Sequence, residues 1–103
     1  KTPKVDLTGL LKEAQMDKTA TKQYLEAVVK VIESIKDWTV ASLETSLHNL
    51  QQKLNLKPRP AFMTIRLAAT GRPATPPLFD VLWILGKKEV VKRLNYVQNQ
   101  LEN

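Results

Sequence analysis

The stretch "IRLAATGRPATPPLFD", from Ile65 to Asp80, combines the features that decide the fold of this chain. Its apolar residues run at helical spacing up to Gly71, and glycine readily ends a helix in the left-handed conformation. Two adjacent prolines follow shortly afterwards, and proline is tolerated in a helix mainly in the first turn. The stretch therefore predicts one helix that stops at Gly71 and another that Thr75 caps and Pro76 and Pro77 open.

Helical periodicity continues on both sides of this stretch. Apolar residues recur three and four positions apart in six segments: Leu7 to Ala14, Leu25 to Ile35, Leu43 to Leu54, Phe62 to Ala69, Leu78 to Leu85 and Val90 to Leu101. We expect Thr19 or Thr21 to cap the second helix, Thr39 to cap the third, Pro60 to open the fourth and Gly86 to end the fifth. Since no segment alternates like a strand, we predict an all-α fold, a single compact bundle of about six helices.

The charge of the chain is unevenly distributed. The 103 residues carry a formal net charge of +6, with 43% hydrophobic and 25% charged residues. Lysines and acids balance in residues 1–50, so the whole excess lies in residues 51–103, together with all four arginines. This asymmetry indicates a surface that faces a polyanion, although a merely solubilising surface accounts for the charge equally well.

Several classes of function find no support in the residues. The chain has no cysteine, which excludes disulfides and thiolate metal sites, and one histidine, His48, which we expect at the surface or its boundary. Neither of the common glycine-rich phosphate loops occurs, and no pair of carboxylates stands out as catalytic. We predict no catalytic residue, no metal site and no membrane span in this chain. Its lack of an initiating methionine also indicates a piece of a longer protein or a processed product.

Arg66 is the most informative polar residue, because it lies in an apolar helical run near the predicted helix end. From there its guanidinium can reach the helix end and offer a planar set of donors to base edges or phosphate. The unpaired N–H groups at the start of the next helix also suit acceptor groups. Two alternatives stay open: Arg66 satisfies the last carbonyls of its own helix, and Leu78, Phe79 and Trp83 belong to the core rather than to a base-stacking surface.

Three linked motifs resemble the C-terminal end of bacterial-type glutamyl-tRNA synthetases. They are "RLAATG" at 66–71, "TPPLFD" at 75–80 and "LGKKEVVKRL" at 85–94, in the order and spacing of that family. The resemblance is clear from about Lys57 to Leu101. This sequence departs from the family pattern in two places, at Ala69, where the family has leucine, and at Lys88–Glu89, where it has Glu-Arg.

The resemblance implies an anticodon-binding domain of the class I synthetase type that spans residues 1–103. Its N-terminal helices would cover about 4–56 and its motif-bearing helices about 57–103. It implies that Arg66, Thr75, Pro76 and Leu78 contact anticodon bases. We predict further contacts to the RNA backbone from basic residues of the same half: Arg59, Arg72, Lys87, Lys88, Lys92 and Arg93.

What the resemblance implies about function concerns a larger parent enzyme. The partners would be the glutamate acceptor tRNA and the rest of a cytoplasmic glutamate–tRNA ligase, which would use ATP and magnesium. The catalytic signatures of that class are absent here, so this segment alone would be non-catalytic and hold no cofactor. The alternatives are the anticodon domain of a class I lysyl-tRNA synthetase and a free-standing basic helical module that binds an acidic protein.

Overall fold

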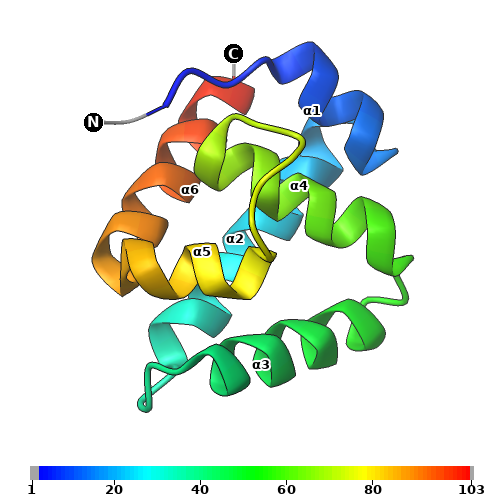
Figure 1. The fold of residues 1–103 in the computed structure, drawn as a ribbon. Coiled ribbons are helices and arrows are strands. Elements are labelled where there is room, and N and C mark those ends of the chain that lie inside the picture. Colours follow the sequence, from blue (N-terminus) through cyan, green and yellow to red (C-terminus); the bar gives the residue numbers. More distant parts are fainter. Residues whose placement is uncertain (1–2, 103) are drawn as a thin grey trace.

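The structure, a computed structural model, describes residues 3–102 and contains six α-helices and no strand within that range (Figure 1). The helices are α1 (Leu7–Ala14), α2 (Lys18–Ser34), α3 (Val40–Lys53), α4 (Pro58–Thr70), α5 (Leu78–Leu85) and α6 (Lys87–Leu101). The prediction of an all-α fold with about six helices is therefore confirmed. None of these helices is long and apolar enough to cross a membrane.

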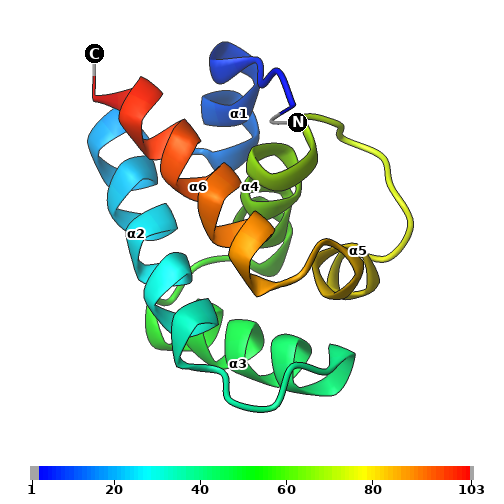
Figure 2. The ribbon, with the colours of Figure 1, turned by 90° about the vertical axis from the view of Figure 1, so that its left-hand side faces the viewer.

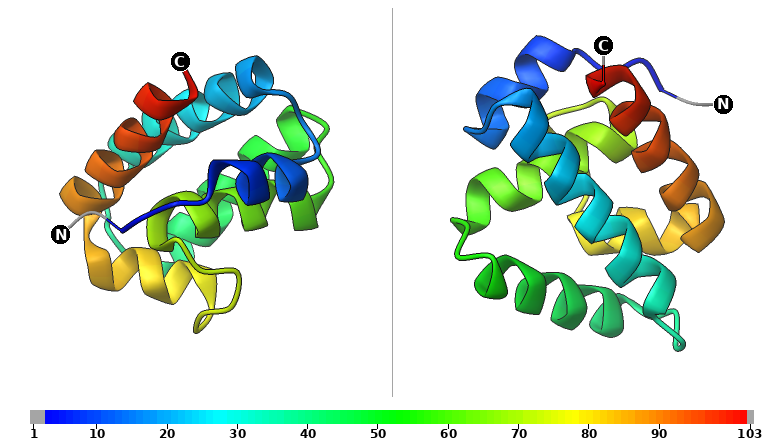
Figure 3. Two further views of the ribbon diagram at one scale, coloured as in Figure 1. Left: turned by 90° about the horizontal axis from the view of Figure 1, so that it is seen from above. Right: turned by 180° about the vertical axis from the view of Figure 1, so that it is seen from behind.

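The helices form pairs that share one core. α2 and α6 lie side by side along most of their length, and α1 packs against α4 (Figure 2). α3 closes one end of the molecule and contacts α5, which in turn contacts α6 (Figures 1 and 3). The buried core takes residues from all six helices, so the chain has a single hydrophobic core within the described range.

The predicted apolar faces are buried on most helices. All five predicted residues of the second face are buried, four of them on α2 and the fifth, Ile35, directly after its end. Two expectations are wrong at the edges of the core: Leu54 is 41% exposed, and Trp83 is 48% exposed. Leu54 follows the last turn of α3, and Trp83 lies one position after the buried Leu82, which turns its side chain about 100° around α5.

A tyrosine links two helices inside the core. The hydroxyl of Tyr24 on α2 donates to the carbonyl oxygen of Ala61 on α4 at 3.0 Å. Burial raises the pKa of Tyr24 well above its ordinary value, because the charged phenolate would lose its hydration. The side chain therefore stays neutral and serves as a hydrogen-bond donor that fixes α4 on α2.

The helix starts differ from the predictions more than the helix ends do. Thr39 caps α3 as expected, by accepting from the backbone N–H of Ser42 at 3.0 Å. α2, however, is capped by Asp17, whose carboxylate accepts from the N–H of Ala20 at 2.8 Å, and not by Thr19 or Thr21. An ionised carboxylate is at least as good a cap as a hydroxyl and gains from the helix dipole.

Proline also sets the start of α4, which begins two residues earlier than predicted. The helix begins at Pro58, with Lys57 at the cap position, and Pro60 lies inside the first turn. Both prolines are tolerated there because the first N–H groups of a helix have no partner within it. The predicted opening at Pro60 is therefore wrong by two residues.

Candidate nucleic-acid interface

The turn after α4 is held by a compact set of hydrogen bonds. Gly71 adopts a left-handed conformation with φ of 72°, and its N–H donates to the carbonyl of Leu67 at 2.8 Å. The hydroxyl of Thr70 donates to the carbonyl of Arg66 at 2.7 Å and accepts from the N–H of Arg72 at 3.1 Å. The predicted stop at Gly71 is confirmed, and the following residues leave α4 in a defined direction.

The segment from Thr75 to Leu78 forms the start of α5 differently from the prediction. Pro77 occupies the cap position, and its carbonyl accepts the first helical hydrogen bond, from Val81 at 3.1 Å. The Thr75 hydroxyl donates to the carbonyl of Pro76 at 2.7 Å instead of capping the helix. Residues before proline disfavour the helical conformation, which acts against helix at Thr75 and Pro76, and the helix starts only at Leu78.

No side chain caps α5, and this leaves backbone donors at its start. Pro77 has no N–H, and the first three N–H groups of the helix, at Leu78, Phe79 and Asp80, have no partner inside the helix. The loop that leads to them arches away from the other helices (Figure 2). These donors and the partial positive charge of the helix start suit acceptor groups of a ligand.

Arg66 is partly buried and has an unsatisfied donor. Its Nε atom is buried and has no hydrogen-bond partner, and its side chain forms no hydrogen bond or ion pair with any other residue of the range 3–102. A buried donor without a partner costs about 1–3 kcal/mol, and more when the group is charged. Such a group in a native fold calls for an explanation, and a ligand that supplies an acceptor is one.

The structural role considered for Arg66 was to satisfy the last carbonyls of α4, and Arg93 fills this role instead. Arg93 on α6 donates from Nη1 to the carbonyl of Ala69 at 2.8 Å and thus satisfies the end of α4. Its Nε also donates to Glu89 at 2.8 Å, and this hydrogen bond holds the pKa of the Glu89 carboxyl below its ordinary value. Because Arg93 caps α4, the side chain of Arg66 is not needed for that purpose.

The basic residues of the second half do not all face solvent. Lys87 donates from Nζ to the carbonyl of Ile35, lies 3.4 Å from the carbonyl of Glu33, and thereby satisfies the end of α2. Its ammonium also lies 5.9 Å from the centre of the Trp38 ring. Lys87 and Arg93 thus have partners in the protein, and four exposed cations remain as candidates for the RNA backbone: Arg59, Arg72, Lys88 and Lys92.

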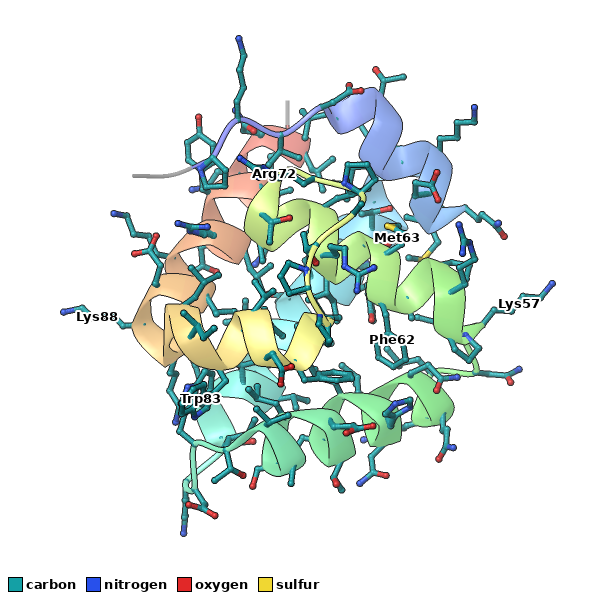
Figure 4. All side chains as sticks on the ribbon, in the orientation of Figure 1. Lys57, Phe62, Met63, Arg72, Trp83 and Lys88 are labelled. Carbon is teal, nitrogen blue, oxygen red and sulfur yellow. The ribbon has the colours of Figure 1, made fainter. Side chains whose placement is uncertain are left out.

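Two of these cations, Arg72 and Lys88, lie at different places on the molecule. Figure 4 shows Arg72 above the end of α4 and Lys88 projecting outward at the far end of α5. Lys88 lies at the start of α6, so α5 separates it along the chain from the turn at 71–76. We expect the basic residues of the second half to lie largely on one side, around that turn, and this stays a prediction. Contacts between these side chains and RNA stay a prediction.

Three aromatic rings meet beside this region, a feature that sequence analysis did not find. His48 of α3 lies 4.8 Å from Phe62 of α4 and 5.8 Å from Phe79 of α5, between ring centroids, and the two phenylalanines are 5.7 Å apart. His48 was expected at the surface or its boundary, and its side chain is 42% exposed. No sequence signal joins residues of three separate helices, so only the fold reveals the cluster.

The predicted site residues differ in their exposure to solvent. Pro76 is exposed and Thr75 is partly buried, but Leu78 is only 5% exposed and belongs to the core. Which of them touches a base stays a prediction. Within residues 3–102, no three histidine, cysteine or acidic residues come together as metal ligands would.

A known protein family matches most of the chain. Residues 3–98 match the family described as "Anticodon binding domain". The chain belongs to the anticodon-binding domain family. The matched range includes α4, the turn, α5 and most of α6, and so contains every candidate residue named above.

Bacterial glutamate–tRNA ligases are among the similar proteins. The chain is 42% identical to that of Roseiflexus castenholzii over 80 residues, which are 78% of this chain and 16% of the relative. It is 40% identical to that of Chloroflexus aurantiacus over 87 residues, 84% of this chain and 17% of the relative. For Mycolicibacterium smegmatis the identity is 34% over 98 residues, 94% of this chain and 20% of the relative.

The chain thus spans about a fifth or less of the length of these ligases. The match to the anticodon-binding domain family concerns this part alone. It fits the all-helical fold of the described residues.

Proposed function

We propose that this protein binds the anticodon loop of a tRNA and forms the anticodon-binding part of a glutamate–tRNA ligase. The observation that carries the proposal is the buried Nε donor of Arg66, which has no partner among the described residues of a chain of the anticodon-binding domain family. Unpaired bases present acceptor atoms at their edges, and a planar guanidinium binds such edges in a defined geometry. The tRNA we propose is the glutamate acceptor, because the similar ligases named above act on glutamate.

The remaining predictions about the parent enzyme belong to this proposal. ATP and magnesium would serve the catalytic part of such a ligase, and we assign no residue of this chain to either. A ligase of this kind would work in the cytoplasm, where translation takes place. The alternative of a lysyl-tRNA synthetase is disfavoured, because the similar proteins named above are glutamate–tRNA ligases.

Replacing Arg66 tests the proposal. Arg66→Ala is expected to weaken binding to the anticodon stem-loop of the glutamate acceptor by about 1–3 kcal/mol, the range for a good bidentate base contact. Arg66→Lys should recover little of this loss, because lysine keeps the charge but lacks the planar fork. The measurement is the dissociation constant of each variant for the cognate stem-loop and for one with a different anticodon.

The possible outcomes separate three roles for Arg66. Full rescue by lysine, with equal weakening for both stem-loops, indicates a phosphate contact and contradicts base reading. A lower melting temperature with unchanged affinity of the folded protein indicates a structural role. A basic module that binds an acidic protein would show no preference between the two stem-loops even before mutation, and that result would overturn the proposed function.

Salt dependence tests the electrostatic part of the same proposal. Each neutralised phosphate of a single strand contributes about −0.7 to the slope of log affinity against log salt, so four contacts give a slope of about −3. Lys88→Gln should make the slope about 0.7 less steep. Lys87→Gln is the matched control, because the Lys87 ammonium is bound to carbonyls at the end of α2 and its loss should leave the slope unchanged.

A slope that does not change with either substitution, or one that changes equally with both, would contradict the division into free and protein-bound cations. Both variants should be compared for melting temperature as well. We expect Lys87→Gln to lower it, since the end of α2 loses its donor.

A further inference from the structure

The cluster of His48, Phe62 and Phe79 lies where α3, α4 and α5 meet. Its three rings come from three different helices, and each lies within 5.8 Å of the other two. His48 and Phe62 meet edge to face, with an interplanar angle of 66°, and so do the two phenylalanines, at 78°. Edge-to-face contacts hold rings in a fixed orientation, so the imidazole rests on a rigid apolar support.

The cluster borders the Arg66 region on two sides. Phe62 precedes Arg66 by four residues, and residues four apart share one face of a helix. Figure 4 shows Phe62 in the space between α4 and α3, on the side of α4 that faces His48. Phe79 directly follows Leu78 and carries one of the uncapped N–H groups at the start of α5.

The imidazole of His48 is supported but not enclosed. Its side chain keeps 42% exposure, whereas Phe62 and Phe79 are partly buried. The carboxylate of Glu44 lies 3.9 Å from its Nε2 and is itself 56% exposed. A half-exposed ring on an apolar support can accept a base on its face, and every nucleobase has a face that stacks.

We propose that His48, held by Phe62 and Phe79, stacks on an unpaired base of the RNA loop next to the base that Arg66 contacts. This inference rests on the proposed function and extends it to α3, a helix outside the motifs at 66–94. Stacking supplies affinity with little sequence preference, whereas the guanidinium of Arg66 supplies selectivity. His48 would therefore contribute affinity for the loop, and Arg66 would contribute discrimination between bases.

The test measures binding of the anticodon stem-loop to His48→Ala and His48→Phe. Stacking of a base on an aromatic side chain is worth about 1–3 kcal/mol, so His48→Ala should weaken binding about 5- to 150-fold. His48→Phe should keep most of the affinity, because a phenyl ring still stacks. Asn49→Ala, an exposed neighbour on the same helix, is the matched control and should change nothing.

Stem-loops with a single abasic position identify the base. At one loop position, loss of the base should weaken binding to the original protein and abolish the further effect of His48→Ala. If His48→Ala weakens binding equally for every abasic stem-loop, the residue does not stack on a base and the inference is overturned. Melting temperatures of all variants show whether an altered affinity reflects the folded protein.

The outcomes keep this inference distinct from the proposed function. If Arg66→Ala weakens binding but His48→Ala and His48→Phe bind like the original protein, the stacking inference fails and the proposed function stands. If the original protein does not bind the stem-loop, both fail. If His48→Ala lowers only the melting temperature, the cluster is a structural contact and the inference is again overturned.

Discussion

Replacing Gly71 with alanine is expected to lower the free energy of unfolding by about 2–5 kcal/mol, as measured by urea denaturation. Gly71 has a φ of 72°, and a left-handed conformation costs an L-residue about 1–2 kcal/mol. A Cβ added there would also lie 2.6 Å from the carbonyl oxygen of Lys4. That atom belongs to the backbone, so relief requires a shift of the segment or the turn, which typically costs about 1–3 kcal/mol more.

Two further variants separate the two contributions. Asparagine tolerates the left-handed conformation better than alanine but also carries a Cβ, so Gly71→Asn should remain destabilised. Deletion of residues 1–4 removes the crowding atom, and in that shortened chain Gly71→Ala should cost only the conformational part. Crowding by Lys4 would be contradicted if Gly71→Asn were as stable as the original protein.

The same contact links the start of the chain to the candidate site. Residues 3–6 pass over the end of α4, where Figures 1 and 2 show the segment that leads into α1. The turn that this segment covers continues into Thr75 and the start of α5. A substitution at Gly71 is therefore expected to disturb the position of the loop as well as the stability of the fold.

The sequence predicted the helices well because burial alone determines their faces. A residue such as Leu25 or Leu94 is apolar, recurs at helical spacing and is 0% exposed in the fold. Helix ends were predicted where a single residue type dominates the local energetics, as at Gly71 and Gly86, both of which have positive φ. In each case the physical cause is local, so the sequence around the residue is sufficient.

Helix starts were harder because several local causes compete there. Asp17 precedes Thr19 and Thr21, and all three have side chains that can cap, but only Asp17 accepts a backbone N–H. At α5 the prolines decide the start, since they disfavour helix at the residues before them, and Pro77 rather than Thr75 occupies the cap position. Capping preference and backbone restriction must both be weighed at such positions.

The candidate site was predicted only in part, because its remaining features depend on contacts between distant residues. Arg66 was singled out from the sequence, but the sequence did not show that its Nε has no partner or that Arg93, 24 residues away, satisfies the end of α4. Lys87 likewise binds a carbonyl 52 residues earlier in the chain. The number of charges along the sequence does not show which cations are bound to backbone carbonyls in the folded protein.

Replacing Leu82 with alanine is the second change with a large expected effect. Leu82 is 0% exposed, and truncation of a fully buried leucine typically lowers the free energy of unfolding by about 2–5 kcal/mol. α5 has eight residues, and only two of them, Leu78 and Leu82, are buried. These two side chains, with the partly buried Phe79 and Leu85, hold the helix on α3 and α6.

Ile84 provides the matched control, because it lies on the same short helix and is 74% exposed. Ile84→Ala should change the free energy of unfolding by less than about 0.5 kcal/mol, as is usual for surface positions. If α5 carries both the uncapped N–H groups and Phe79, Leu82→Ala should also weaken RNA binding under conditions in which the variant is still folded. Hydrogen exchange of the α5 amides measures the loosening directly, and amides that exchange as slowly as in the original protein would show that Leu82 does not hold the helix in place.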